Sequence, residues 1–234
     1  MKFLRSLFLS LAALAAVAAS AQNISIATGG TGGVYYPMGG GLAAILSKYV
    51  PGMQATAEVT GGSVDNLKLI GSGKPYVGFS MADAALDAAK GEDKFKGSNV
   101  PVKTLAVLYP NRMHVVTVEG KGINKFADLK GKRVSTGSPG SATEVMAFRL
   151  IEAAGMDSDN KQATVMNILV AHEKMDEKTA YNIVKTLFDK QPELVAVHKE
   201  AENIKLENQK NSATPIPFHP GAIKYFAEKG IKVQ

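Results

Sequence analysis

The stretch that decides the fold runs over residues 22–41 and reads QNISIATGGTGGVYYPMGGG. Ile24 and Ile26 alternate with polar or small neighbours, and this period of two predicts a β-strand. The strand gives way to the glycine loop TGGTGG at residues 28–33. Pro37 then suits the first turn of a helix, because its missing N–H would have no partner there. The stretch therefore predicts a strand, a glycine loop and a helix.

The same unit repeats along the first half of the chain. A second strand is predicted over residues 53–60, followed by the small-residue turn 61–63 and a short helix. A third strand over 77–80 leads into an alanine-rich helix over 82–89, and a fourth strand covers 104–109. This alternation predicts an α/β fold with a parallel-rich sheet flanked by helices, in which ligands bind where strand ends meet helix starts.

A second α/β stretch follows. Strands are predicted over residues 113–118 and 133–136, and a small-residue loop at 137–143 opens a helix that runs to Ala154. Beyond residue 162 the pattern predicts helices only. These are one capped by Asp176, one opened by Pro192, and one over 222–228 that ends near Gly230.

The first residues have the form of a secretory leader. Lys2 and Arg5 precede an apolar run over residues 7–19, and small residues end the segment just before Gln22. This predicts a signal peptide over residues 1–21, with cleavage before Gln22 and export to the periplasm. The run is shorter than the roughly 18 to 20 residues of a membrane span, and no later stretch is longer, so no span is expected in the mature chain.

Composition excludes several classes of protein. With no cysteine, the 234-residue chain has neither disulfides nor thiol chemistry, and its four histidines are not spaced as metal ligands. The formal net charge is +6, and the lysines are spread along the chain and are densest in the C-terminal helices, where glutamates are interleaved with them, so no basic stripe with interleaved aromatic residues appears. We expect no metal, no cofactor and no nucleic-acid partner.

Two motifs come close to enzyme signatures. The loop at 28–33 lacks the ending of a P-loop, and Tyr35 occupies the last glycine position of a dinucleotide fingerprint. Ala82 breaks the nucleophile-elbow pattern around Ser80. A periplasmic serine hydrolase that uses Ser80 or Ser141 is an alternative hypothesis, but no motif supplies a base, so the chain is not expected to be an enzyme.

Five stretches, in order along the chain, resemble the TAXI-type solute-binding receptors of tripartite ATP-independent periplasmic (TRAP) transporters. They are TGGTGGVYYPMGGG (28–41), TGGSVDNLKLI (60–70), VGFSMADA (77–84), LYP (108–110) and DLKGKRVSTGSPGSATE (128–144). The resemblance implies a periplasmic-binding-protein-like fold of two lobes. It also implies capture of a small organic anion or amino acid between the lobes and delivery to the membrane permease subunits of the transporter.

The resemblance also implies a set of ligand contacts, all of them at the starts of helices or at the crossover between the lobes. They are Thr31, Gly32, Val34, Tyr35, Ser63, Asn66, Ser80, Asp83, Tyr109, Ser138, Gly140, Ser141 and Thr143. Backbone N–H groups and hydroxyls of this kind suit a reversibly bound carboxylate. Each hydroxyl is equally suited to capping its own helix.

The division into lobes follows from the same reading. Residues 22–111 and 166–234 are expected to form the first lobe, and residues 112–165 the second. The second lobe is much shorter than the ~100 to 150 residues of a typical domain, which indicates an internal deletion near residues 157–165. A degenerate receptor without ligand binding is therefore a second alternative.

Overall fold

The computed structural model describes residues 22–74, 76–154 and 164–234, so the predicted signal peptide and most of the expected deletion site lie outside the described residues. Its centre is a five-stranded sheet with strand order β2-β1-β3-β5-β4. The strands are β1 (Gln22–Ala27), β2 (Met53–Glu58), β3 (Tyr76–Met81), β4 (Val102–Arg112) and β5 (Thr164–His172).

The sheet is mixed, because β5 runs opposite to the other strands. β1 pairs in parallel with β2 and with β3, whereas β5 lies antiparallel to both β3 and β4. Ile24 and Ile26 of β1 are almost completely buried, as the alternation predicted. The α/β class and the arrangement expected of a periplasmic-binding-protein-like fold are thereby confirmed.

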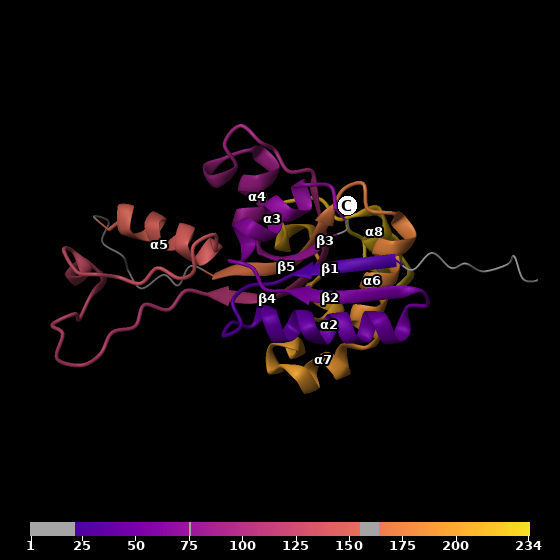
Figure 1. The fold of residues 1–234 in the computed structure, drawn as a ribbon, viewed down its shortest axis with the longest axis horizontal. Helices are drawn as coiled ribbons and strands as arrows, with labels where there is room; N and C mark the ends of the chain where they lie inside the picture. Colours follow the sequence, from indigo (N-terminus) through magenta and orange to yellow (C-terminus); the bar gives the residue numbers. More distant parts are fainter. Residues whose placement is uncertain (1–21, 75, 155–163) are drawn as a thin grey trace, which may run out of the picture.

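Helices cover both faces of the sheet (Figure 1). The helices of the described structure are α2 (Tyr35–Tyr49), α3 (Ser63–Gly71), α4 (Ala82–Lys90), α5 (Ala142–Glu152), α6 (Glu177–Asp189), α7 (Gln191–Val197) and α8 (Pro220–Glu228), of which α5 lies beyond the end of the sheet. α2 packs with α6 and α7 on one face, and α3 packs with α4 on the other. No helix within the described ranges is long and apolar enough to cross a membrane.

The strand order creates a crevice. From β1 the chain crosses through α2 to β2 at the sheet edge, and from β2 it returns through α3 to β3 on the other side of β1. Such a reversal leaves an opening at the carboxyl ends of the central strands, where open α/β sheets bind their ligands. The glycine loop after β1 and the turn after β3 both reach this point.

The prediction of helices alone beyond residue 162 is wrong, because β5 occupies residues 164–172. Its central residues Ile168 and Leu169 are fully buried between two neighbouring strands. A strand that is buried in this way has a continuous apolar run instead of alternation, and periodicity does not separate such a run from a buried helix.

The two strands predicted at 113–118 and 133–136 are also absent. Between β4 and α5 the only regular element is the single turn η2 (Phe126–Leu129). Valines and threonines favour extended backbone, but a strand needs a neighbour to satisfy its N–H and C=O groups. Within the described part of the chain, no neighbouring strand reaches this segment, so it runs as an extended loop (Figure 1).

Candidate ligand-binding site

A cavity of about 580 Å³ opens at the crevice of the sheet, between the carboxyl ends of the strands and the loop that precedes α5. The residues that line it come from seven separate segments. They are Gly29, Gly30, Gly32–Tyr35, Gly61–Ser63, Met81, Tyr109–Arg112, His114, Gly137, Ser138, Ser141–Thr143, Asn167 and Glu200.

Four helices begin at the cavity wall, because α2, α3, α4 and α5 start at or beside Tyr35, Ser63, Met81 and Ser141. The first backbone N–H groups of a helix have no partner within it, and the helix dipole adds a partial positive charge at that end. Convergence of several such ends favours a bound anion, and α3 contributes through its dipole because the N–H groups of Val64 and Asp65 already donate to the Gly140 carbonyl.

The loop before α5 is clasped to the first turn of α3. The Gly140 carbonyl accepts hydrogen bonds from the N–H groups of Val64 (3.1 Å) and Asp65 (3.3 Å). Gly140 has a φ of 78°, and a Cβ there would lie 2.5 Å from Asp65 Oδ1. Only glycine fits this close approach without strain. Gly140 therefore joins the two sides of the cavity through its backbone and does not itself line it.

A buried side-chain amide connects the residues that form one wall of the cavity. Asn167 of β5 accepts hydrogen bonds at Oδ1 from the Tyr35 hydroxyl and, at 3.1 Å, from Asn111 Nδ2. Its own Nδ2 donates to the Tyr109 carbonyl at 3.3 Å. A single side chain thus fixes residues from α2 and β4. The sequence reading did not identify Asn167, because β5 itself was not predicted.

The two tyrosines of this wall are neutral phenols. Burial is the main cause that raises the pKa of Tyr109 well above its ordinary value, and it also raises the pKa of Tyr35. The Tyr109 hydroxyl is buried and has no hydrogen-bond partner in the described structure. An unpaired buried donor is energetically unfavourable by about 1 to 3 kcal/mol, so a ligand acceptor at this point would relieve it.

Eight of the thirteen predicted contact residues line the cavity. They are Gly32, Val34, Tyr35, Ser63, Tyr109, Ser138, Ser141 and Thr143. Two of their hydroxyls accept hydrogen bonds from the backbone. Ser141 Oγ caps α5 by accepting from Glu144 N–H, and Ser63 Oγ accepts from Met81 N–H, both at 3.1 Å. A hydroxyl that accepts such a bond keeps its own proton, so capping and ligand binding are compatible.

The remaining five predicted residues do not line the cavity. Thr31 is exposed, and Gly140 forms the clasp to α3. Asn66 is buried and donates to the carbonyls of Thr28 (2.6 Å) and Phe79 (2.8 Å), so it ties strand ends together. The two other residues, Ser80 and Asp83, belong to an adjacent polar cluster.

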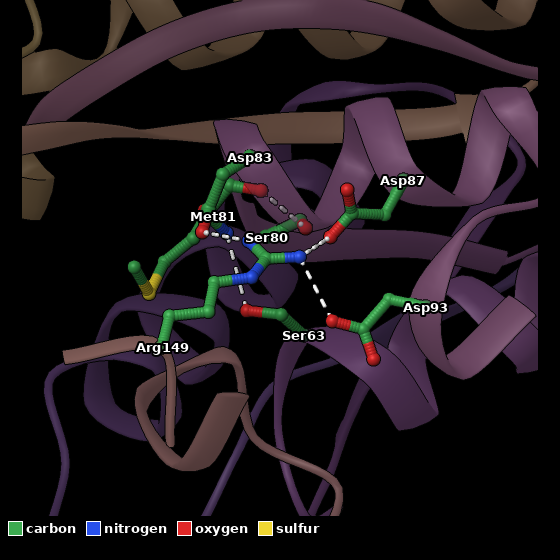
Figure 2. Close-up of polar contacts among 7 residues, drawn as sticks. All are labelled: Ser63, Ser80, Met81, Asp83, Asp87, Asp93 and Arg149. Carbon is green, nitrogen blue, oxygen red and sulfur yellow. Dashed lines mark hydrogen bonds and ion pairs between the residues drawn. The ribbon is translucent and has the colours of Figure 1, made fainter. Parts of the chain in front are cut away.

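Figure 2 shows this cluster, which includes the cavity residues Ser63 and Met81. The Ser80 hydroxyl is fully buried and donates to the Met81 carbonyl at 2.9 Å. Asp83 lies 3.5 Å from Arg149 Nη1, and the same guanidinium pairs more closely with Asp87 and Asp93. Burial raises the pKa of Asp83, and the nearby Arg149 charge offsets part of this effect. The cluster therefore ties α5 to α4 and supports the cavity from outside.

Sequence reasoning also missed three polar side chains of the cavity. Arg112 and His114 lie at the end of β4 and just beyond it, and Glu200 comes from the C-terminal part of the chain. They were not identified because none of them lies in one of the sequence motifs that suggested ligand contacts. In the residues that the structure covers, no group of three or more His, Asp or Glu side chains is placed to hold a metal ion.

A comparison with protein families matches this chain to the model of the NMT1-like family over residues 26–166 and 162–230. The chain belongs to the NMT1-like family. This is a periplasmic-binding-protein-like family of solute-binding proteins, which agrees with the sheet order and with a cavity at the strand ends. The two matched stretches meet at residues 162–166, beside the position where the sequence indicated a deletion.

Proposed function

We propose that this NMT1-like protein is the extracytoplasmic receptor of a TRAP-type transporter of the TAXI class. It captures a small organic anion or amino acid in the cavity and delivers it to the membrane permease subunits. The observation that carries the proposal is the convergence of four helix N-termini on one cavity of about 580 Å³. That volume suits a metabolite-sized ligand.

The charges of the cavity suggest how the ligand is oriented. Arg112 and the start of α5 offer positive charge toward a carboxylate, and the Ser141 hydroxyl adds a donor. Glu200 offers an acceptor of opposite sign in the same cavity. An amino acid carries both groups and would satisfy both, whereas a simple carboxylate would use only the first.

The lobes and their closure belong to the same proposal. Residues 22–111 and 166–234 would form the fixed lobe that carries the sheet, and residues 112–165 a reduced second lobe that contributes Ser138, Ser141 and Thr143. A family match that ends and restarts at residues 162–166 supports an internal deletion there. Because α5 still reaches the cavity, the shortened lobe retains the contacts that a receptor needs.

Calorimetric titration of the purified protein against a panel of amino acids and small carboxylates tests the proposal. We expect saturable binding by at least one member, and we expect Ser141→Asp to abolish it, because aspartate still caps α5 but places negative charge against the anion. Ser72→Asp is the matched control, since it adds the same charge at the opposite end of α3. Absence of binding across the panel, or equal binding by both variants, would contradict the proposal.

A further inference from the structure

The segment between β4 and the loop that precedes α5 has no role in the cavity beyond its first residues. We call residues 113–136 the basic arm. Figure 1 shows that this part of the chain extends well away from the sheet before it returns to α5. Its five basic side chains are all exposed, and no ion pair in the described structure includes any of them. They are Lys121, Lys125, Lys130, Lys132 and Arg133.

The basic arm holds most of the net charge of the secreted chain. The formal net charge of the whole sequence is +6, of which Lys2 and Arg5 in the predicted leader contribute two. The arm contains five basic and two acidic residues, a net charge of +3 out of the remaining +4. The body of the protein is therefore close to neutral, and the positive field is concentrated on one projection.

The arm also exposes apolar side chains. Val115 is 54% exposed, Val116 is 86% exposed and Val118 is 66% exposed. Isolated exposed valines are ordinary, but a contiguous group next to clustered lysines marks an interaction site. Because the arm contains no strand and only one helical turn, it offers no preformed shape for a folded partner.

We propose that the basic arm docks the protein on an anionic lipid bilayer. Lysines attract acidic headgroups, and the valines insert at the boundary with the acyl chains; a surface of this kind tolerates an irregular segment. The arm leaves the sheet at Arg112 and His114, which line the cavity. Docking would therefore hold the cavity mouth beside the membrane, where a permease takes up ligand. This inference is independent of the ligand's identity.

Co-sedimentation with vesicles tests the proposal. We expect the purified protein to bind vesicles that contain about 30% phosphatidylglycerol and not vesicles of phosphatidylcholine alone. We expect the binding to fall steeply as salt rises to about 0.5 M, because the headgroup charges are then screened. Equal binding to both vesicle types, or to neither, would overturn the proposal and leave an acidic protein surface as the partner.

Two triple variants locate the effect. Lys121→Glu, Lys130→Glu and Lys132→Glu together should weaken binding to anionic vesicles about 100-fold or more, since each charge near the surface contributes roughly fivefold. Lys68→Glu, Lys96→Glu and Lys174→Glu form the control, because these exposed lysines lie outside the arm and change the net charge equally. A similar loss in both variants would show that overall charge is responsible and would overturn the proposal.

A third variant separates insertion from charge. Val115→Ser, Val116→Ser and Val118→Ser together keep every charge, and we expect them to weaken vesicle binding about tenfold or more because apolar insertion is lost. Unchanged far-UV circular dichroism verifies the fold, since these residues lie outside the sheet. Undiminished binding by this variant would overturn the role assigned to the valines.

Discussion

The guanidinium of Arg149 in α5 lies 2.6 Å from the Asp87 carboxylate in α4, although the two residues are 62 positions apart. Two further carboxylates, those of Asp83 and Asp93, lie within 3.5 Å of the same group. One cation thus holds three acidic side chains, and this contact, the Gly140 clasp and the buried side chains of Ala142 and Val145 attach α5 to the body. Since Thr143 lies in α5 and Ser141 caps that helix, the position of these cavity residues depends on Arg149.

Replacement of Arg149 by methionine should loosen α5 without unfolding the sheet. The variant keeps an unbranched apolar stem but removes the guanidinium and leaves three carboxylates facing one another, which we expect to lower the local stability of α5 by about 1 to 2 kcal/mol. Amide hydrogen exchange should then become roughly tenfold faster in α5 and stay unchanged in β1 and β3. Ligand affinity should fall in parallel.

Lys185→Met is the control for this experiment. It breaks the Lys185–Asp189 pair within α6, which is far from the cavity and contributes only a few tenths of a kcal/mol. Exchange in α5 should not respond to this control. If α5 exchanges equally in wild type and in Arg149→Met, then the Arg149 cluster does not hold the helix.

Tyr109→Phe should have opposite effects on stability and on binding. Removal of a buried hydroxyl without a partner should raise the free energy of unfolding of the ligand-free protein by about 1 kcal/mol. Loss of the same donor should weaken ligand binding about tenfold. Urea denaturation and calorimetry measure the two quantities separately.

The matched control is Tyr225→Phe. Its hydroxyl donates to Asp189 Oδ1 at 3.1 Å and lies away from the cavity, so its removal should lower stability and leave ligand affinity unchanged. A Tyr109→Phe variant that loses stability and keeps its affinity would show that the hydroxyl has no part in binding.

The sequence was sufficient to predict the repeating strand, loop and helix units. Glycine loops, Pro37 and apolar spacing are local signals, and each of them marks an element that the structure contains. The antiparallel strand β5 could not be predicted in the same way, because its apolar run fits a buried strand or a buried helix equally well. Asn167 and Glu200 reach the cavity only through the way that distant segments pack together, which no local pattern encodes.

The opposite error occurred at residues 113–118 and 133–136. Their side chains favour extended backbone, and the segment is indeed extended, but it forms no strand. Pairing decides whether that preference becomes a strand, and pairing depends on segments elsewhere in the chain. The valines are exposed as a result, and this exposure is what distinguishes the basic arm.

Asp83→Asn should stabilise the protein in a pH-dependent manner. Burial raises the pKa of Asp83 above its ordinary value of 3.8, so the folded state binds this proton more tightly than the unfolded chain does. The stability contributed by Asp83 is therefore present at low pH and is lost as pH rises through the raised pKa. The advantage of the variant in urea denaturation should be larger at neutral pH than near pH 4.

Asp176→Asn provides a contrast of opposite sign. Hydrogen bonds from the backbone N–H and the hydroxyl of Thr179 lower the pKa of Asp176, so its contribution is present at neutral pH and is lost as pH falls through the lowered pKa. This variant should be less stable than wild type at neutral pH and approach it in acid. If the stability of the two variants relative to wild type changed with pH in the same direction, burial would not be the cause that dominates the pKa of Asp83.

The final prediction concerns the stability of the proposed second lobe, residues 112–165. Its described part contains one helix of regular length and only the ends of β4 and β5, so few of its amides are protected by a ladder and few of its apolar side chains are buried. A small unit without disulfides or a metal is marginally stable, and this one is attached to the body by the Gly140 and Arg149 contacts and by the buried side chains of Ala142 and Val145. We therefore expect native-state hydrogen exchange to be faster by several orders of magnitude in residues 134–150 than in residues 24–79. Ligand should protect residues 141–150 more than it protects the sheet, because binding joins α5 to the body. Equal protection of the two regions in the ligand-free protein would show that the second lobe is complete as it stands and that the inferred deletion is wrong.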